Sequence, residues 1–338
     1  PVKSPTDGKD DKQWVAVGRH PTNPAKEAFY VAWHTAARIF VSYSADGLTW
    51  SDALRVSDDA HSIDSIPVVL EDGTLMVCWD DWDTTGMGTL ECDAAVDVTA
   101  ATQLAGSHTV TSTTLMVSDA SVFPSVPFSV HLGNEIADVT NVNLGTNILT
   151  VTRGTQGTTA SAHSTSATVN LYHKDRIVDI TSINPFKDPT TPPTAWNRYT
   201  IPAHPTRGVW SGISLDIDRI GGTYSNRIYM AYADQEAGGG GHDDLGVYVT
   251  WLDPNRSTDL TVSFTSSATE IPVVDASVFD TVPFRILIDD EIIDVTNVDL
   301  GANTLTVLRG TNFSTPASHG DNPAVTSFWQ EPVKVNDD

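Results

Sequence analysis

A long internal repeat determines how this chain is divided. Residues 119–155 recur at 275–311 without a gap, and 24 of the 37 aligned positions are identical. A repeat of this quality predicts one structural module used twice, and the remaining residues then form a host scaffold interrupted in two places. The predicted parts are scaffold at 1–106, a first module at 107–172, scaffold at 173–257, a second module at 258–327, and a closing scaffold strand at 328–338.

Residue patterns along the whole chain predict an all-β fold. Runs of strand length rich in Val, Ile, Thr, Tyr and Trp alternate with clusters of Gly, Asp, Asn and Pro. No window sustains an apolar stripe at helical spacing. In the scaffold the runs group into units of four strands. The units are 13–17, 29–33, 39–44 and 54–56; then 66–69 and 75–79, closing at 199–201; then 213–217, 228–232, 247–251 and 333–335.

One segment of the first unit carries a recognisable motif. The residues that match the Asp-box pattern Ser-x-Asp-Gly-x-Thr-Trp in full are Ser44, Asp46, Gly47, Thr49 and Trp50. Together with the strand-like runs at 14–17 and 29–33, this segment resembles the sialidase-like β-propellers that carry Asp-box (BNR) repeats. The resemblance extends over about 1–106, 173–257 and the C-terminal residues.

This resemblance implies a β-propeller in which the motif is structural. Asp46 and Gly47 would fix a tight turn and Trp50 would pack between blades, and we favour this role for Asp46 over a catalytic one. The segment 332–334 repeats the Pro-Val-Lys of residues 1–3, so the chain is expected to start and stop in the same phase of the repeat. About three blades are fewer than the four to eight of closed propellers. We therefore expect a partial propeller, or one that copies complete by association.

The two modules resemble small β-modules of phage-tail, virion and other bacterial extracellular structural proteins. Each shows four short strands, and Arg153 with His163 recurs as Arg309 with His319. We interpret the histidines as hydrogen-bonding loop residues rather than metal ligands or acid–base groups. For the arginines two interpretations stay open, which are contact with a partner and an ion pair with a carboxylate of the module.

The chain has two cysteines, Cys78 and Cys92, which are equidistant from Thr85 in a predicted turn. A hairpin centred on that turn would place them opposite each other on neighbouring strands. A disulfide and a pair of buried free thiols are both compatible with this placement. The spacing fits no zinc pattern.

Acidic clusters follow two of the predicted inner strands. The candidate ligands for a hard cation are Asp80, Asp81, Asp83, Asp234, Glu236, Asp243 and Asp244. Because Ca²⁺ prefers six to eight oxygen ligands, a calcium site is chemically possible, but solvated acidic loops are the favoured interpretation. The nearby Trp33, Trp79 and Trp82 could form a sugar-binding face, although aromatic residues in strands more often belong to a core.

The resemblance also makes a demand on catalytic residues. A sialidase uses three arginines around the substrate carboxylate, a tyrosine nucleophile with a glutamate, and an aspartate acid–base group. That family has a characteristic Arg-Ile-Pro segment, and none of the scaffold arginines here is followed by Ile-Pro. The nearest match is Arg19, which is followed by His20 and Pro21. We therefore assign no catalytic residue and do not expect this chain alone to be a sialidase.

The net charge of the chain limits the classes of partner that we expect. With 43 acidic and 19 basic residues the formal charge is −24, which repels nucleic acids and anionic lipid. No stretch approaches the roughly 20 apolar residues of a membrane-spanning helix. We expect a non-catalytic extracellular, cell-surface or virion-associated protein that self-associates, assembles with other structural proteins, or attaches to glycans. The alternatives are a sialidase-like glycoside hydrolase completed by blades absent from this chain, and a carbohydrate-binding lectin.

Overall fold

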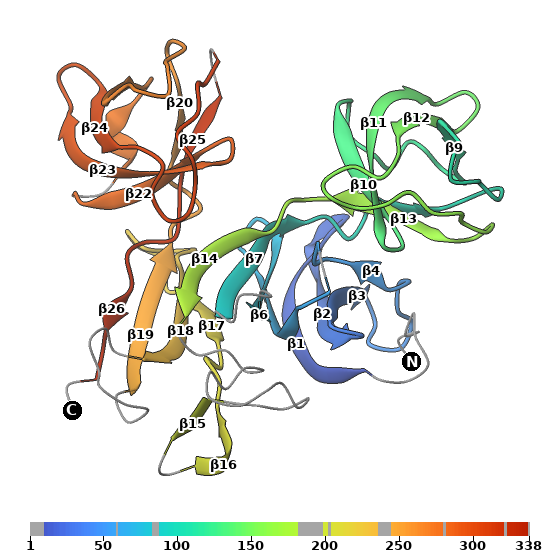
Figure 1. The fold of residues 1–338 in the computed structure, drawn as a ribbon, viewed down its shortest axis with the longest axis horizontal. Coiled ribbons are helices and arrows are strands. Elements are labelled where there is room, and N and C mark those ends of the chain that lie inside the picture. The colour runs from blue at the N-terminus through green and yellow to red at the C-terminus, as the bar shows by residue number, and fades with distance from the viewer. Residues whose placement is uncertain are drawn as a thin grey trace. The chain divides into compact units, whose positions relative to one another are not determined.

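The computed structural model describes residues 10–58, 60–82, 88–181, 199–201, 204–235, 245–279, 282–320 and 323–336. Within these ranges the only helical element is a short 3₁₀ turn at Ala276–Val278, and the predicted all-β class is confirmed. None of the helical residues described could span a membrane. The chain separates into two compact units, 1–198 and 199–338, and each is described by itself (Figure 1).

The first unit begins with two four-stranded antiparallel sheets. The first sheet contains, in spatial order, β1 (Asp11–His20), β2 (Asn23–Thr35), β3 (Arg38–Ser44) and β4 (Leu54–Arg55). The second contains β5 (Ile63–Val69), β6 (Leu75–Trp82), β7 (Gly88–Val96) and β14 (Arg176–Thr181). Each strand is therefore paired with its neighbour along the chain, except that the first module separates β7 from β14.

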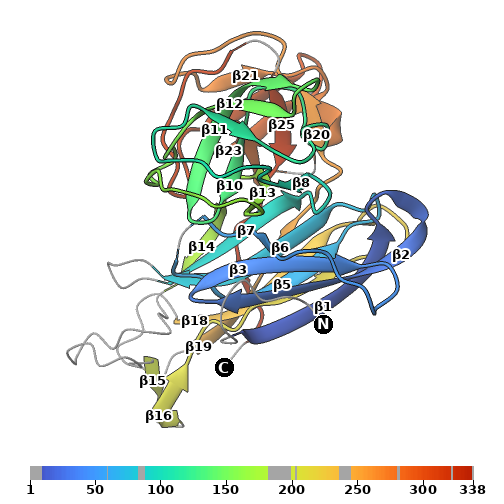
Figure 2. The same cartoon turned by 90° about the vertical axis from the view of Figure 1, so that its right-hand side faces the viewer.

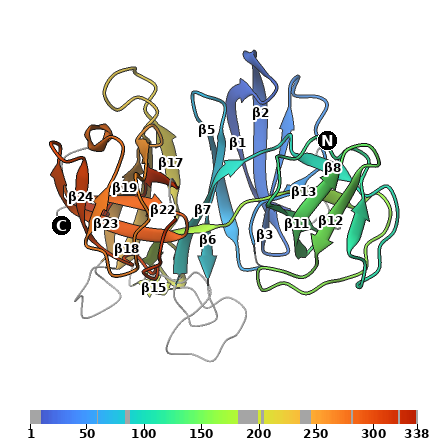
Figure 3. The same ribbon diagram turned by 90° about the horizontal axis from the view of Figure 1, so that it is seen from above.

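The two sheets pack face to face, with β1 and β2 beside β5 (Figure 3). Their shared core includes Tyr30, Val41 and Trp79, all fully buried. Gly18 on β1 permits a close approach, since a Cβ at this position would lie 2.4 Å from the side chain of Val69. The apolar residues on this face of β1 and β2 thus explain why the sheets stack.

The opposite face of the first sheet is apolar and exposed. Val15 and Val17 alternate with the residues of β1 that face β5, and Phe29 pairs with Val17 in the register of β1 and β2. The exposed fractions of Val15, Val17 and Phe29 are 60, 46 and 40%. The face of the first sheet that does not pack on β5 therefore exposes several apolar side chains.

The first module is a six-stranded sheet that curls into a half-barrel. Its strands are β8 (Ala101–Gln103), β9 (Thr114–Met116), β10 (Phe128–Leu132), β11 (Glu135–Asn143), β12 (Ile148–Thr152) and β13 (Thr168–Tyr172), in the order β8-β13-β10-β11-β12-β9. The two edges meet at a bridge between Leu104 and Val117. A separate apolar core fills the inside of this curled sheet. Strand β7 leads into the module and β14 leads out of it (Figure 2).

The second unit repeats this plan. Its hairpin of β15 (Tyr199–Ile201) and β16 (His204–Val209) precedes a four-stranded sheet of β17 (Ser214–Ile217), β18 (Ile228–Gln235), β19 (Leu245–Leu252) and β26 (Val333–Lys334). The second module contains β20 (Ser257–Asp259), β21 (Glu270–Pro272), β22 (Phe284–Ile288), β23 (Glu291–Asp299), β24 (Thr304–Leu308) and β25 (Ala324–Ser327). Its strand order matches that of the first module, and a bridge between Leu260 and Val273 joins its edges.

Both modules are inserted at the same point of a four-stranded sheet, between its third and fourth strands. In the first sheet the same connection, from β3 to β4, holds the Asp-box turn. One prediction was wrong: Tyr199–Ile201 does not close the second sheet but pairs with β16, and β14 takes the edge position. A register shift between Ile177 and Asp179 breaks the alternation of β14, which hid this strand in the sequence.

Candidate functional site

Each module encloses a buried carboxylate bound by an arginine and a histidine. In the first module Glu135, at the start of β11, is 0% exposed. Its Oε1 accepts from Nε of Arg153 at 2.5 Å, and its Oε2 accepts from Nη2 of Arg153 at 2.7 Å. Nε2 of His163 lies 3.0 Å from Oε2. The backbone amides of Gly154 and Ser161 also donate to this carboxylate.

The second module repeats the network. Arg309 donates to both oxygens of Glu291 at 2.7 and 2.6 Å, and Nε2 of His319 lies 2.9 Å from Oε2. The glycine that follows each arginine is required, because Gly154 has a φ of +63° and a Cβ there would lie 2.6 Å from the amide of Ala160. The repeated Arg-Gly-Thr triplet is thus part of the module's own interior.

The two buried carboxylates are held in their charged form. Burial alone would raise the pKa of Glu135, but hydrogen bonds from Arg153, Ser161 and His163 outweigh it and lower the pKa to about 2. The same balance lowers the pKa of Glu291 to about 2. The side chains of Arg153 and Arg309 are each 6% exposed. Both arginines therefore form an ion pair with a carboxylate of their own module, which was one of the two interpretations.

The Asp-box residues form a closed turn between β3 and β4. Oδ1 of Asp46 accepts from the amides of Leu48 and Thr49 at 2.8 and 2.7 Å, and from the hydroxyl of Ser44 at 3.0 Å. The amide hydrogen bonds, led by that of Thr49, lower the pKa of Asp46 to about 2. Gly47 has a φ of +73°. In this geometry Asp46 fixes the turn, and the half-buried Trp50 follows it.

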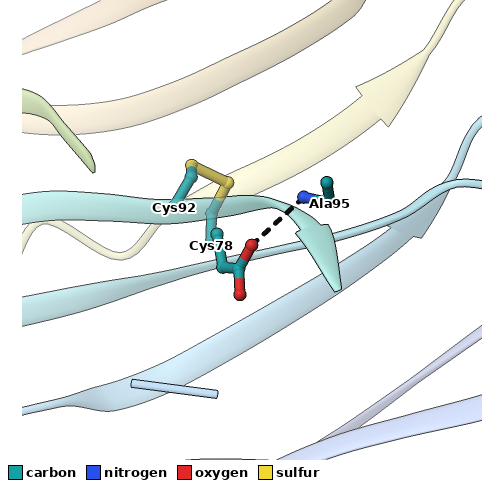
Figure 4. The surroundings of a disulfide bond; sticks show 4 residues. Cys78, Cys92 and Ala95 are labelled. Carbon is teal, nitrogen blue, oxygen red and sulfur yellow. Dashed lines mark hydrogen bonds between the residues drawn. A yellow bond between two sulfur atoms is a disulfide. The ribbon is translucent and has the colours of Figure 1, made fainter. Parts of the chain in front are cut away.

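Cys78 on β6 and Cys92 on β7 are joined by a disulfide (Figure 4). They are direct partners in the register of the two strands, with Cα atoms 4.0 Å apart. The next residue, Asp93, is 3% exposed and accepts from the amide of Ala95 at 3.1 Å. Burial raises the pKa of Asp93 to about 7, and the Ala95 amide only partly opposes it.

The predicted cation ligands are not assembled among the described residues. Asp83, Glu236, Asp243 and Asp244 lie outside them, and the remainder contain no group of three acidic, histidine or cysteine side chains that could hold a metal ion. Asp80 and Asp81 lie within β6 and are 1 and 3% exposed, so the expectation of solvated loops is wrong for these two. Asp234 lies on β18 in the other unit.

Two of the three tryptophans considered for a sugar-binding face are buried. Trp33 and Trp79 are 2 and 0% exposed, and Trp79 belongs to the core between the first two sheets. The side chain of Trp82 is outside the described part of the chain. Packing therefore accounts for both, since Trp33 stacks on Phe40 with ring centroids 6.1 Å apart.

A pair of carboxylates that the sequence did not reveal lies where the first module meets the first sheet. The Asp58 amide donates to Oδ2 of Asp175 at 2.5 Å, and the Asp175 amide donates to Oδ2 of Asp58 at 3.2 Å. The hydroxyl of Tyr172 donates to Asp58 at 3.0 Å. Burial raises the pKa of Asp58 to about 6, and burial followed by the charge of Asp58 raises the pKa of Asp175.

The second unit contains a pocket of about 310 Å³ between its four-stranded sheet and its module. Two arginines line it, Arg227 before β18 and Arg256 before β20. Oδ2 of Asp253 accepts from Nη2 of Arg227 and from Nε of Arg256, each at 3.1 Å. The guanidinium of Arg227 lies over the ring of Tyr224 at 4.0 Å. Its lining also includes Trp251, Phe279 and Phe284.

The chain matches no protein-family model, and no curated protein is similar to it.

Proposed function

We propose that this chain is a non-catalytic extracellular structural protein that works by assembly and surface attachment. Its four-stranded sheets would be blades of a partial β-propeller of the sialidase-like Asp-box type, and its modules would protrude from that scaffold. Three observations support this reading. They are the antiparallel meander of each four-stranded sheet, the Asp-box turn after β3, and the insertion of both modules at the connection equivalent to that turn.

The exposed apolar face of the first sheet carries the assembly proposal. Val15, Val17 and Phe29 lie on the face opposite to the one that packs on β5. Contiguous apolar surface of this kind marks an interaction site. A second copy of this chain is the partner we propose, because sheets of the same type already stack on the other face. Leu144 and Leu300, each 63% exposed at the same turn of the two modules, add equivalent contact points.

The test of this proposal is the mass of the chain in solution. Light scattering over a range of concentrations should show a defined oligomer, and the double variant V15E/V17E should be smaller with an unchanged melting temperature. Ile220→Glu is the matched control, since Ile220 is 93% exposed and lies in the second unit. A monomer at every concentration, or equal loss of assembly in both variants, would count against the proposal.

Glycan attachment is the second candidate, and the pocket of the second unit favours it. Trp251, Phe279 and Phe284 line this pocket, and aromatic walls suit the apolar face of a sugar ring. The hydrolase alternative has less support, since it asks for three arginines around one carboxylate. In this pocket Arg227 and Arg256 are already bridged by Asp253.

A further inference from the structure

Two carboxylates exchange hydrogen bonds across the border between the first module and the scaffold. Asp58 lies in the connection from β4 to β5, and Asp175 lies in the connection from β13 to β14, by which the chain leaves the module. Oδ2 of Asp175 accepts from the amide of Asp58 at 2.5 Å, and Oδ2 of Asp58 accepts from the amide of Asp175 at 3.2 Å. This reciprocal pair therefore joins a loop of the scaffold to the exit of the module.

One oxygen of each side chain in this pair has no donor. Oδ1 of Asp58 and Oδ1 of Asp175 are buried and accept no hydrogen bond from the part of the chain that the structure describes. Because the amide of each residue reaches the carboxylate of the other, the two carboxylates lie close together. A buried charged oxygen without a donor is costly, and two such charges side by side repel each other. The pair is therefore most stable when it carries a proton.

Most of the charges that act on the pair are negative. From β7, Asp93 acts on both members and Glu91 acts on Asp175. Arg55 on β4 is the positive group that acts on Asp58, but burial raises the pKa of Asp58 more than Arg55 lowers it. The other polar or charged groups beside the pair are Tyr172 on β13, whose hydroxyl donates to Asp58, and Lys174 and Arg176, which flank Asp175 in the chain. The pair therefore keeps a raised pKa in spite of one nearby arginine.

The border of the second module has a different arrangement at the equivalent positions. At the constant spacing of 156 residues, Tyr172 and Asp175 correspond to Phe328 and Glu331. The side chain of Glu331 is 77% exposed and pairs with Arg285 of the second module. A phenylalanine cannot donate the hydrogen bond that Tyr172 makes. The coupled carboxylates therefore belong to the first border, and the second border is an internal control for them.

The other groups at the first border do not change charge near neutral pH. Nδ2 of Asn170 donates to the carbonyl of Arg55 at 3.0 Å, and Nη1 of Arg55 donates to the carbonyl of Gly133 at 2.9 Å. Two histidines, His131 and His173, lie at this border, and burial lowers the pKa of each. Both histidines are therefore neutral at and above pH 7. The carboxylates are the groups through which pH acts on this border.

From these observations we propose that Asp58 and Asp175 form a pH-dependent contact, which holds the first module on the scaffold while the pair keeps a proton and loosens when both side chains are ionised. Burial raises the pKa of Asp58 to about 6 and that of Asp175 well above 3.8. The stability that the pair contributes is therefore complete below pH 3.8 and is lost as the pH rises through about 6 and beyond. Asp93, whose pKa burial raises to about 7, adds its charge in the same range. The contact goes beyond the proposed function, because it does not depend on what the modules bind.

Hydrogen exchange of the full chain at several pH values from about 5 to about 9 tests the proposal. Protection factors, which correct for the intrinsic effect of pH on exchange, are compared for peptides of the two borders. Peptides that contain the amides of Asp58 and Asp175 report on the first border, and those that contain Phe328 and Glu331 report on the second. We expect protection at the first border to fall at least tenfold more than at the second, since one unit of pKa shift is a tenfold change. An equal change at both borders would overturn the proposal.

Variants assign the effect to the pair. Asp58→Asn should remove most of the pH dependence at the first border, because asparagine keeps an acceptor oxygen for Tyr172 and for the amide of Asp175 but carries no charge. Glu27→Gln is the matched control, since it removes one negative charge at an exposed position of the same unit and should leave the pH dependence unchanged.

Asp93→Asn separates the pair from its neighbour. Protection at the first border should still fall with pH in this variant, and complete loss of the fall would assign the effect to Asp93 and overturn the proposal. An unchanged fall in Asp58→Asn would overturn it as well. Should Asp58→Asn fail to fold, the comparison of the two borders in the unaltered chain still decides.

Discussion

Replacement of Glu135 by glutamine should destabilise the first module and leave the second intact. The substitution keeps the size of the side chain but leaves Arg153, 6% exposed, without its counter-charge. A pKa that falls from 4.5 to about 2 corresponds to about 3 kcal/mol of stability at neutral pH. In other proteins, removal of one partner from a buried ion pair lowers the free energy of unfolding by about 3–5 kcal/mol. We therefore expect a loss of about 3 kcal/mol.

Hydrogen exchange followed by mass spectrometry measures this loss in each module separately. At pH 7 the slowest amides of β10, β11 and β12 should exchange about a hundredfold faster in Glu135→Gln, as about 3 kcal/mol requires. The corresponding strands of the second module serve as an internal control. Glu291→Gln should give the reciprocal result, because the distances around Glu291 match those around Glu135.

The pH dependence gives an independent check. Since the folded pKa of Glu135 is lowered, its stabilising contribution is present above pH 4.5 and is lost as the pH falls toward 2. The unaltered chain and Glu135→Gln should therefore converge in unfolding free energy near pH 2. A change of less than about 1 kcal/mol at pH 7, or equal acceleration of exchange in both modules, would refute the reasoning from buried charge.

Three further changes test other parts of the first unit. Replacement of both Cys78 and Cys92 by serine removes a disulfide that closes a loop with a sequence separation of 14 residues. The free energy of unfolding measured in urea should fall by about 3 kcal/mol. The same replacement should cost nothing comparable when the reference chain has been reduced. Asp93→Asn should stabilise the chain at pH 8 but not at pH 4. Burial raises the pKa of Asp93 to about 7. The stability that the protonated side chain contributes is therefore complete below pH 3.8 and is lost as the pH rises through 7. An unchanged pH slope in the Asp93 variant would contradict this. Gly18→Ala should reduce the free energy of unfolding by about 1–3 kcal/mol through overpacking against Val69, which a lower melting temperature would reveal. Gly106→Ala is the control, because a Cβ there meets no atom within 4 Å and the melting temperature should not change.

The sequence was most informative inside the repeat and least informative at its borders. The runs at 128–130 and 148–151, whose apolar residues recur in the second copy, predicted the strands that the structure has at Phe128–Leu132 and Ile148–Thr152. Strands β8 and β13 were not predicted, and β8 has only three residues, Ala101–Gln103, all half-buried. Such short edge strands are defined by the neighbours they pair with, not by their own pattern.

Side-chain partners show the same limit. Glu135, Arg153 and His163 all recur at the same spacing in the second copy, so the repeat contained the network, and an ion pair for Arg153 was one of its two interpretations. Asp58 and Asp175 are 117 residues apart, and nothing in either segment indicates the other. Their proximity follows from where the first module leaves the sheet, which is a property of the tertiary fold.

The two modules differ most where they meet their sheets, and this is where their functions could diverge. Inside, both use the same arginine, glutamate and histidine. At the border, Arg55 of the first sheet donates to the carbonyl of Gly133 at 2.9 Å, whereas in the second module Arg285 pairs with Asp294 and Glu331. A constant interior keeps each module folded while its border residues are free to vary.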